Sequence, residues 1–149
     1  MALDPQTLAA LDPADFVALV KATSDREIRE DLGGEHRVAL LDAIFGKFPQ
    51  QFRPDKAGDR SARIDFRITG GPADSSDLYA VAVADGVCTV EKDPTGDPDL
   101  SLMMGPVEFL KIITGTGNPA MMFMMGKVKA RGDLGLAGGL ANWFEPPAS

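Results

Sequence analysis

The chain has 149 residues, of which 44% are hydrophobic and 25% charged, and it contains one Cys and one His. This composition is typical of a globular domain and excludes collagen-like, disordered and disulfide-rich proteins. The 22 acidic side chains outnumber the 15 Lys and Arg, and the resulting net charge of −7 argues against nucleic acid as a partner.

The first third of the chain predicts helices with clearly marked starts. Asp4 and Asp12 each precede a proline, the pattern of an N-cap acceptor followed by a first helical residue that needs no N–H. Ser24 and Glu27 form a capping box for a third helix. A longer helix is expected from about Glu35 to Phe48 and should pack against a sheet. Its apolar positions are Val38, Leu40, Leu41, Ile44, Phe45 and Phe48.

From residue 61 the apolar period changes to two, which predicts strands. Residues 61–69 alternate apolar and charged side chains, as expected for a half-buried strand. Segments 78–84 and 87–91 flank Asp85-Gly86, a pair preferred in the type I′ turn of a hairpin. A further strand is expected at 100–104.

Helices return after this strand. Pro106 opens one helix, a short helix follows over 120–125, and residues 127–131 alternate as in a strand with one solvated face. Asp133 caps a closing helix that ends before Pro146. The order of elements predicts an α+β fold in which a meander sheet carries helices on one face.

The ionisable and nucleophilic side chains do not form a recognisable catalytic set. His36 is expected at an exposed helix start, with Arg37 solvated beside it. Cys88 is expected to be a small buried side chain, and no second histidine is present to activate it. No serine lies in a nucleophile elbow, and the acidic group around Asp97 lacks the other positions of a calcium loop. We therefore expect no enzyme activity, no cofactor and no metal.

Six of the seven methionines lie between Met103 and Met125. Residues 121–125 are all apolar, so a helix there must be buried on every side or must line something apolar. One interpretation is plain core. The other is a ligand cavity, because methionine is unbranched and adapts to ligands of irregular shape. Gly138-Gly139 in the closing helix fits either a tight helix crossing or a hinge.

Two segments resemble the signature of the sterol carrier protein 2 (SCP2) family. Residues Ile113–Pro119 end in a Gly-x-x-Asn-Pro turn, and residues Gly126–Leu136 follow the pattern Gly-Lys-hydrophobic-x-hydrophobic-x-Gly-Asp that leads into the last helix. The resemblance extends from about Val38 to Phe144.

The resemblance implies a five-stranded, mostly antiparallel sheet covered by helices around an apolar tunnel. It implies non-catalytic binding or transfer of a sterol, fatty acid, acyl-CoA or phospholipid, with transient membrane contact at most. The tunnel residues carried over by position are Phe109, Ile112, Ile113, Met121, Met122, Met125, Leu136, Leu140 and Trp143.

The resemblance also divides the chain into an N-terminal helical extension, 1–34, and an SCP2-like lipid-binding domain, 35–149. The extension offers a surface for a homodimer or a cover for the tunnel mouth. A cytoplasmic location is expected, because the chain has one cysteine and its start does not have the pattern of a signal peptide. Three alternatives stay open: a protein-interaction module, an accessory domain of a lipid-metabolising enzyme without its own ligand, and a small enzyme for a hydrophobic substrate.

Overall fold

The computed structural model describes residues 4–53, 55, 61–114, 119–133 and 135–136. Its first three helices are α1 (Pro5–Ala10), α2 (Pro13–Ala22) and α3 (Asp25–Asp31). Each begins at the predicted cap, where the side chains of Asp4, Asp12 and Ser24 accept hydrogen bonds from backbone N–H groups at 3.1, 2.8 and 3.1 Å. These caps satisfy N–H groups that the helix itself leaves unpaired.

The single long helix predicted next is two helices, α4 (Arg37–Phe45) and α5 (Phe48–Gln51). Gly46 ends α4, and Pro49 lies in the first turn of α5, where its missing N–H is tolerated. Val38 was predicted to lie on the apolar face of this helix that packs against the sheet, but its side chain is 41% exposed. Arg37, which was expected to be solvated, is buried instead.

Five strands form one sheet in the order β3-β2-β1-β4-β5. They are β1 (Ala62–Ile68), β2 (Asp77–Ala84), β3 (Val87–Lys92), β4 (Leu100–Met104) and β5 (Val128–Gly132). The predicted meander is correct for β1, β2 and β3, and the positive φ angles of Asp85 and Gly86 fit the predicted I′ turn. It is wrong for β4, which pairs with β1 in parallel, while β5 is antiparallel to β4.

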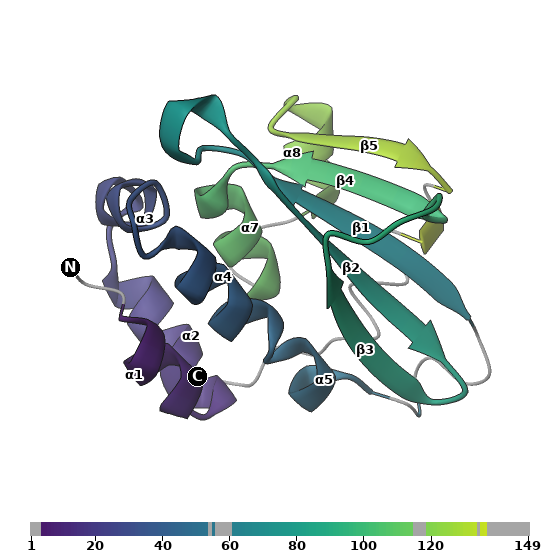
Figure 1. Ribbon diagram of the computed structural model, residues 1–149, viewed down its shortest axis with the longest axis horizontal. Coiled ribbons are helices and arrows are strands. Elements are labelled where there is room, and N and C mark those ends of the chain that lie inside the picture. Colours follow the sequence, from purple (N-terminus) through teal and green to yellow (C-terminus); the bar gives the residue numbers. More distant parts are fainter. Residues whose placement is uncertain (1–3, 54, 56–60, 115–118, 134, 137–149) are drawn as a thin grey trace.

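Figure 1 shows the helices gathered on one side of this sheet. Helices α4, α5 and α7 (Pro106–Ile113) lie nearest the strands, α1–α3 lie beyond them, and α8 (Pro119–Met124) lies by the β5 edge. The core between the layers is rich in aromatic rings, with centroids 4.1–6.2 Å apart. The rings belong to Phe45, Phe48, Phe66, Tyr79 and Phe109.

Helices α1–α3 share this core instead of forming one of their own. Leu8, Phe16, Val20, Ile28 and Leu32 belong to the same cluster of buried side chains as the strand residues. None of the described helices is long and apolar enough to cross a membrane.

Candidate functional site

Helix α7 carries the first three residues predicted to line a ligand site. Pro106 occupies its first turn and Glu108 and Lys111 stand near its two ends with the signs that favour the helix dipole. The Thr114 hydroxyl closes the last turn by donating to the Leu110 carbonyl at 2.7 Å. Lys111 Nζ lies 3.4 Å from Asp25 Oδ2 of α3, an ion pair between half-exposed side chains of the two helices.

Phe109 is fully buried in the aromatic core. Its ring centroid is 4.8 Å from that of Phe45, 5.9 Å from Phe66 and 6.2 Å from Phe48. A ligand that reaches Phe109 must therefore displace neighbouring rings.

Four more predicted residues lie at the margin of this core. Each is partly buried and packed against the core cluster: Ile112, Ile113, Met122 and Leu136. They come from α7, from α8 and from the segment after β5, and we call these four residues the apolar fringe. Leu140 and Trp143, and the Gly138-Gly139 pair, lie outside the described residues.

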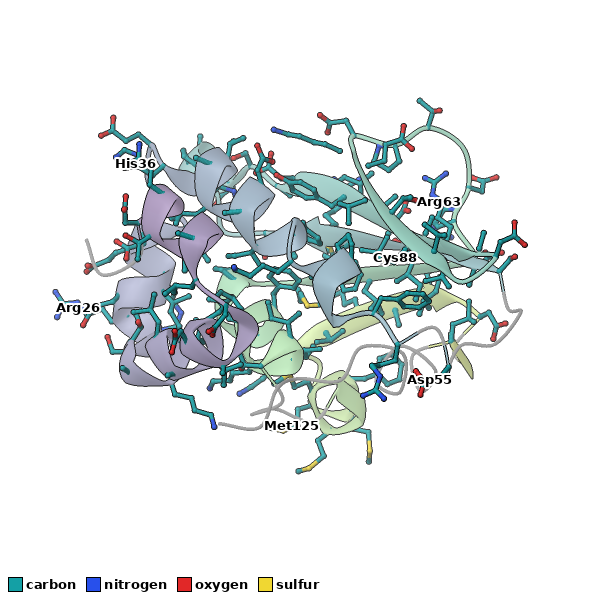
Figure 2. The ribbon with its side chains drawn as sticks, turned by 90° about the horizontal axis from the view of Figure 1, so that it is seen from below. Arg26, His36, Asp55, Arg63, Cys88 and Met125 are labelled. Atoms are coloured by element: carbon teal, nitrogen blue, oxygen red, sulfur yellow. The ribbon has the colours of Figure 1, made fainter. Side chains whose placement is uncertain are left out.

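The outer side chains of α8 are exposed. Met121 and Met125, both predicted to line the site, are 59% and 64% exposed, and Met124 is 83% exposed. Figure 2 shows sulfur-bearing side chains at α8, near the label of Met125, pointing away from the body of the molecule. The interpretation of residues 121–125 as plain core is therefore wrong for all of them except Met122.

Two surface hollows lie away from the predicted site residues. One of about 230 Å³ is on the helix-free face of the sheet and is lined by Arg67, Ser101, Met103, Lys129, Ala130 and Arg131. The other, of about 270 Å³, is at the start of α7 and is lined by Arg29, Gly70, Gly105, Pro106, Val107 and Glu108. Neither includes any of the nine predicted site residues, so the tunnel stays a prediction.

The candidate catalytic side chains His36 and Cys88 lie far apart, as Figure 2 shows. His36 is half exposed at the N-cap of α4 with Glu35 at 3.6 Å, and Cys88 is buried on the helix side of β3, both as predicted. In the part of the chain that the structure describes, no group of three His, Cys, Asp or Glu side chains could hold a metal ion.

Cys88 is expected to be unreactive while the chain is folded. Burial raises the pKa of its thiol to about 11, so only about one molecule in a thousand carries the thiolate at pH 8. A disulfide reagent such as DTNB should leave Cys88 unmodified in the native chain and modify it fully in urea. Rapid modification of the native chain at pH 8 would contradict this placement.

Two buried polar groups that the sequence pattern did not reveal anchor the helices. Lys47 Nζ donates to the Leu11 carbonyl at 2.8 Å and lies 5.5 Å from the Phe16 ring centroid, and burial lowers its pKa. The Tyr79 hydroxyl donates to Asp42 Oδ1 at 2.5 Å, and burial followed by that hydrogen bond raises its pKa. Both groups join elements of the core, so their role is structural.

The chain is similar in sequence to proteins of one known family. Residues 43–145 match the SCP-2 sterol transfer family. The chain is 32% identical to human sterol carrier protein 2 over 77 residues, which is 52% of this chain and 14% of that protein. It is 42% identical over 45 residues to hydroxysteroid dehydrogenase-like protein 2 of Xenopus tropicalis, covering 30% of this chain and 11% of that one. The matched segments are thus a small part of these relatives.

Solved structures share the fold. The sterol carrier protein domain 2 of Helicoverpa armigera superposes with a TM-score of 0.57 at 21% identity, covering 72% of this chain and 87% of that one. The stereoselective inverting sec-alkylsulfatase Pisa1 from Pseudomonas gives a TM-score of 0.65 at 17% identity, covering 76% of this chain and 17% of that one. The predicted α+β class, with a five-stranded and mostly antiparallel sheet, is confirmed.

Proposed function

Because the chain belongs to the SCP-2 sterol transfer family, we propose that it binds an apolar lipid and carries or presents it without catalysing a reaction. The ligand class is a sterol, fatty acid, acyl-CoA or phospholipid. The observation that carries the proposal is the apolar fringe of Ile112, Ile113, Met122 and Leu136, whose side chains the core covers only in part, together with the exposed methionines that flank Met122 in the chain.

The apolar fringe is suited to lipids of different shapes. All nine predicted residues are apolar, and each methylene group of a ligand that leaves water gains about 0.8 kcal/mol. In this proposal the ligand meets Ile112, Ile113 and Met122 along its length, with Met121 and Met125 at the opening. Phe109 is the innermost of these residues and Leu136 contributes from the segment after β5, while Leu140 and Trp143 stay predicted ligand residues.

Replacement of Met122 by Ala is expected to weaken lipid binding about fivefold, because the half-buried side chain loses about 1 kcal/mol of apolar contact. Titration with a fluorescent fatty acid measures this, and mass spectrometry of the denatured wild-type chain should detect co-purified lipid. Val87→Ala is the matched control, because Val87 is exposed on β3 at the far edge of the sheet. No saturable binding and no co-purified lipid would refute the proposal.

A second candidate is an accessory domain without its own ligand. It is favoured by the lengths of the similar proteins, because the matched part covers 14% of human sterol carrier protein 2 and 17% of the sulfatase chain. The fatty acid titration distinguishes the two candidates, since an accessory domain without its own ligand takes up no fatty acid.

A homodimer through α1–α3 would use the polar outer faces of these helices, because their main apolar side chains lie in the core.

A further inference from the structure

The helix-free face of the sheet carries a hollow of about 230 Å³ over β1, β4 and β5, strands that lie side by side in the sheet (Figure 1). We call it the strand hollow. It admits one small molecule, because sites for drug-sized ligands measure about 300–1,000 Å³. Its lining consists of Arg67, Lys129, Arg131, Ser101, Met103 and Ala130.

The strand register brings the three cations of this lining together. Lys129 pairs with Met103 across β5 and β4, and Met103 pairs with Arg67 across β4 and β1. Arg131 pairs with Ser101 further along β5. Neighbouring strands lie about 4.8 Å apart, which places the Cα atoms of Arg67 and Lys129 about 10 Å from each other. The long side chains of Arg and Lys span such a distance, and all three line the same hollow.

The polar groups of the strand hollow keep donors for a ligand. In the part of the chain that the structure describes, Arg67 donates one hydrogen bond, to Ser76 Oγ at 3.0 Å, and forms no ion pair. Within the same part of the chain, the side chains of Lys129, Arg131 and Ser101 form no hydrogen bond or ion pair. Three cations and a hydroxyl group are therefore available together.

The acidic side chain that shares this face of β1 is already satisfied. Asp65 lies two residues before Arg67, and its two oxygens accept from Arg63 Nε and Nη2 at 2.9 and 3.0 Å. The Arg63 guanidinium also donates to the Thr95 carbonyl at 2.6 Å. Arg63 and Asp65 thus satisfy each other, whereas Arg67 has no acidic partner among the residues described.

We propose that the strand hollow binds a small organic phosphate, a phosphate monoester on a short carbon skeleton. The phosphate group carries close to two negative charges and three acceptor oxygens that point in different directions. Arg67 and Arg131 offer planar sets of N–H donors, Lys129 offers an ammonium group and Ser101 a hydroxyl group. Met103 offers apolar contact to the carbon skeleton.

Other anions fit this arrangement less well. A carboxylate has one charge and two oxygens in one plane, so a single arginine satisfies it. A nucleic acid or an acidic peptide needs a longer row of cations than one hollow provides, and the net charge of −7 repels both. A small anion meets the three cations at short range, where their attraction exceeds the screened repulsion of distant acidic groups.

An NMR titration of the isotope-labelled full chain with glycerol phosphate tests the proposal, at constant ionic strength. We expect saturable shifts of the amide signals of Ser101, Lys129 and Arg131, weaker binding of succinate, and no such shifts with glycerol. Lys129→Gln and Arg131→Gln should each weaken the binding of glycerol phosphate about tenfold, as expected for the loss of one hydrogen bond between charged groups.

Lys127→Gln is the matched control, because Lys127 is an exposed cation two residues before Lys129 that does not line the hollow. It should bind glycerol phosphate as the unaltered chain does, and urea unfolding checks that every variant is folded. No saturation at millimolar glycerol phosphate would overturn the proposal. Equal binding of succinate, or an equal loss of affinity in Lys127→Gln and Lys129→Gln, would also overturn it.

This proposal goes beyond the carrier function and can be tested separately from it. Fluorescent fatty acid titration of Lys129→Gln and Arg131→Gln should give unchanged affinity, because these exposed residues lie on the helix-free face. A chain that binds glycerol phosphate but no fatty acid would remove the carrier function and support this proposal. Release of bound fatty acid by glycerol phosphate would place the anion in the lipid site and overturn the proposal.

Discussion

A chain that starts at Glu35 is expected not to reach a stable native state. The segment 4–34, which contains helices α1–α3, places five large side chains in the shared core, with exposed fractions of 0–6%. They are Leu8, Phe16, Val20, Ile28 and Leu32. Burial of one such side chain contributes about 1.5–3 kcal/mol, so their loss is comparable to the whole stability of a typical domain, about 5–15 kcal/mol.

Near-ultraviolet circular dichroism and urea unfolding of the truncated chain measure this effect. We expect a weak aromatic signal and no cooperative transition. The full chain with Arg26→Gln is the control, because that side chain is 87% exposed and makes only a surface ion pair with Glu30. A truncated chain that unfolds cooperatively at the same urea concentration would show that residues 1–34 are a separable extension.

Replacement of Arg37 by Met is expected to lower the free energy of unfolding by about 3–5 kcal/mol. The Arg37 side chain is 3% exposed, and its Nε donates to Asp77 Oδ2 at 2.7 Å. Its other nitrogens donate to the Leu32 carbonyl at 2.8 Å, the Thr69 carbonyl at 3.1 Å and the Ile68 carbonyl. Methionine fills a similar volume but leaves these acceptors without donors, and unmade buried hydrogen bonds are costly.

Urea unfolding of Arg37→Met measures the loss. Arg67→Met is the matched control, because Arg67 is exposed and should change stability by no more than about 0.5 kcal/mol. A double variant, Arg37→Met with Asp77→Leu, should recover part of the loss, since it no longer leaves Asp77 without its cation. A loss below about 1 kcal/mol for Arg37→Met would contradict the anchoring role.

Much of the fold follows from short-range patterns. The caps at Asp4, Asp12 and Ser24 and the turn at Asp85-Gly86 were predicted correctly, because each depends on residues only a few positions apart. The pairing of β4 with β1 was not predicted, because a parallel pair depends on where the chain returns after a crossover. The family motif supplied the nine site residues, but the placement of their side chains could not be derived from it.

The sequence by itself determined the helix starts, the strand period, the hairpin and the family of this protein, since these features are local or are carried by a motif. Only the tertiary structure decided that Arg37 is buried, that α8 faces outward and that the cations of β1 and β5 form one cluster. The physical reason is that burial and charge clustering depend on which distant segments meet. Arg67 and Lys129 are far apart in sequence and become neighbours only through β4.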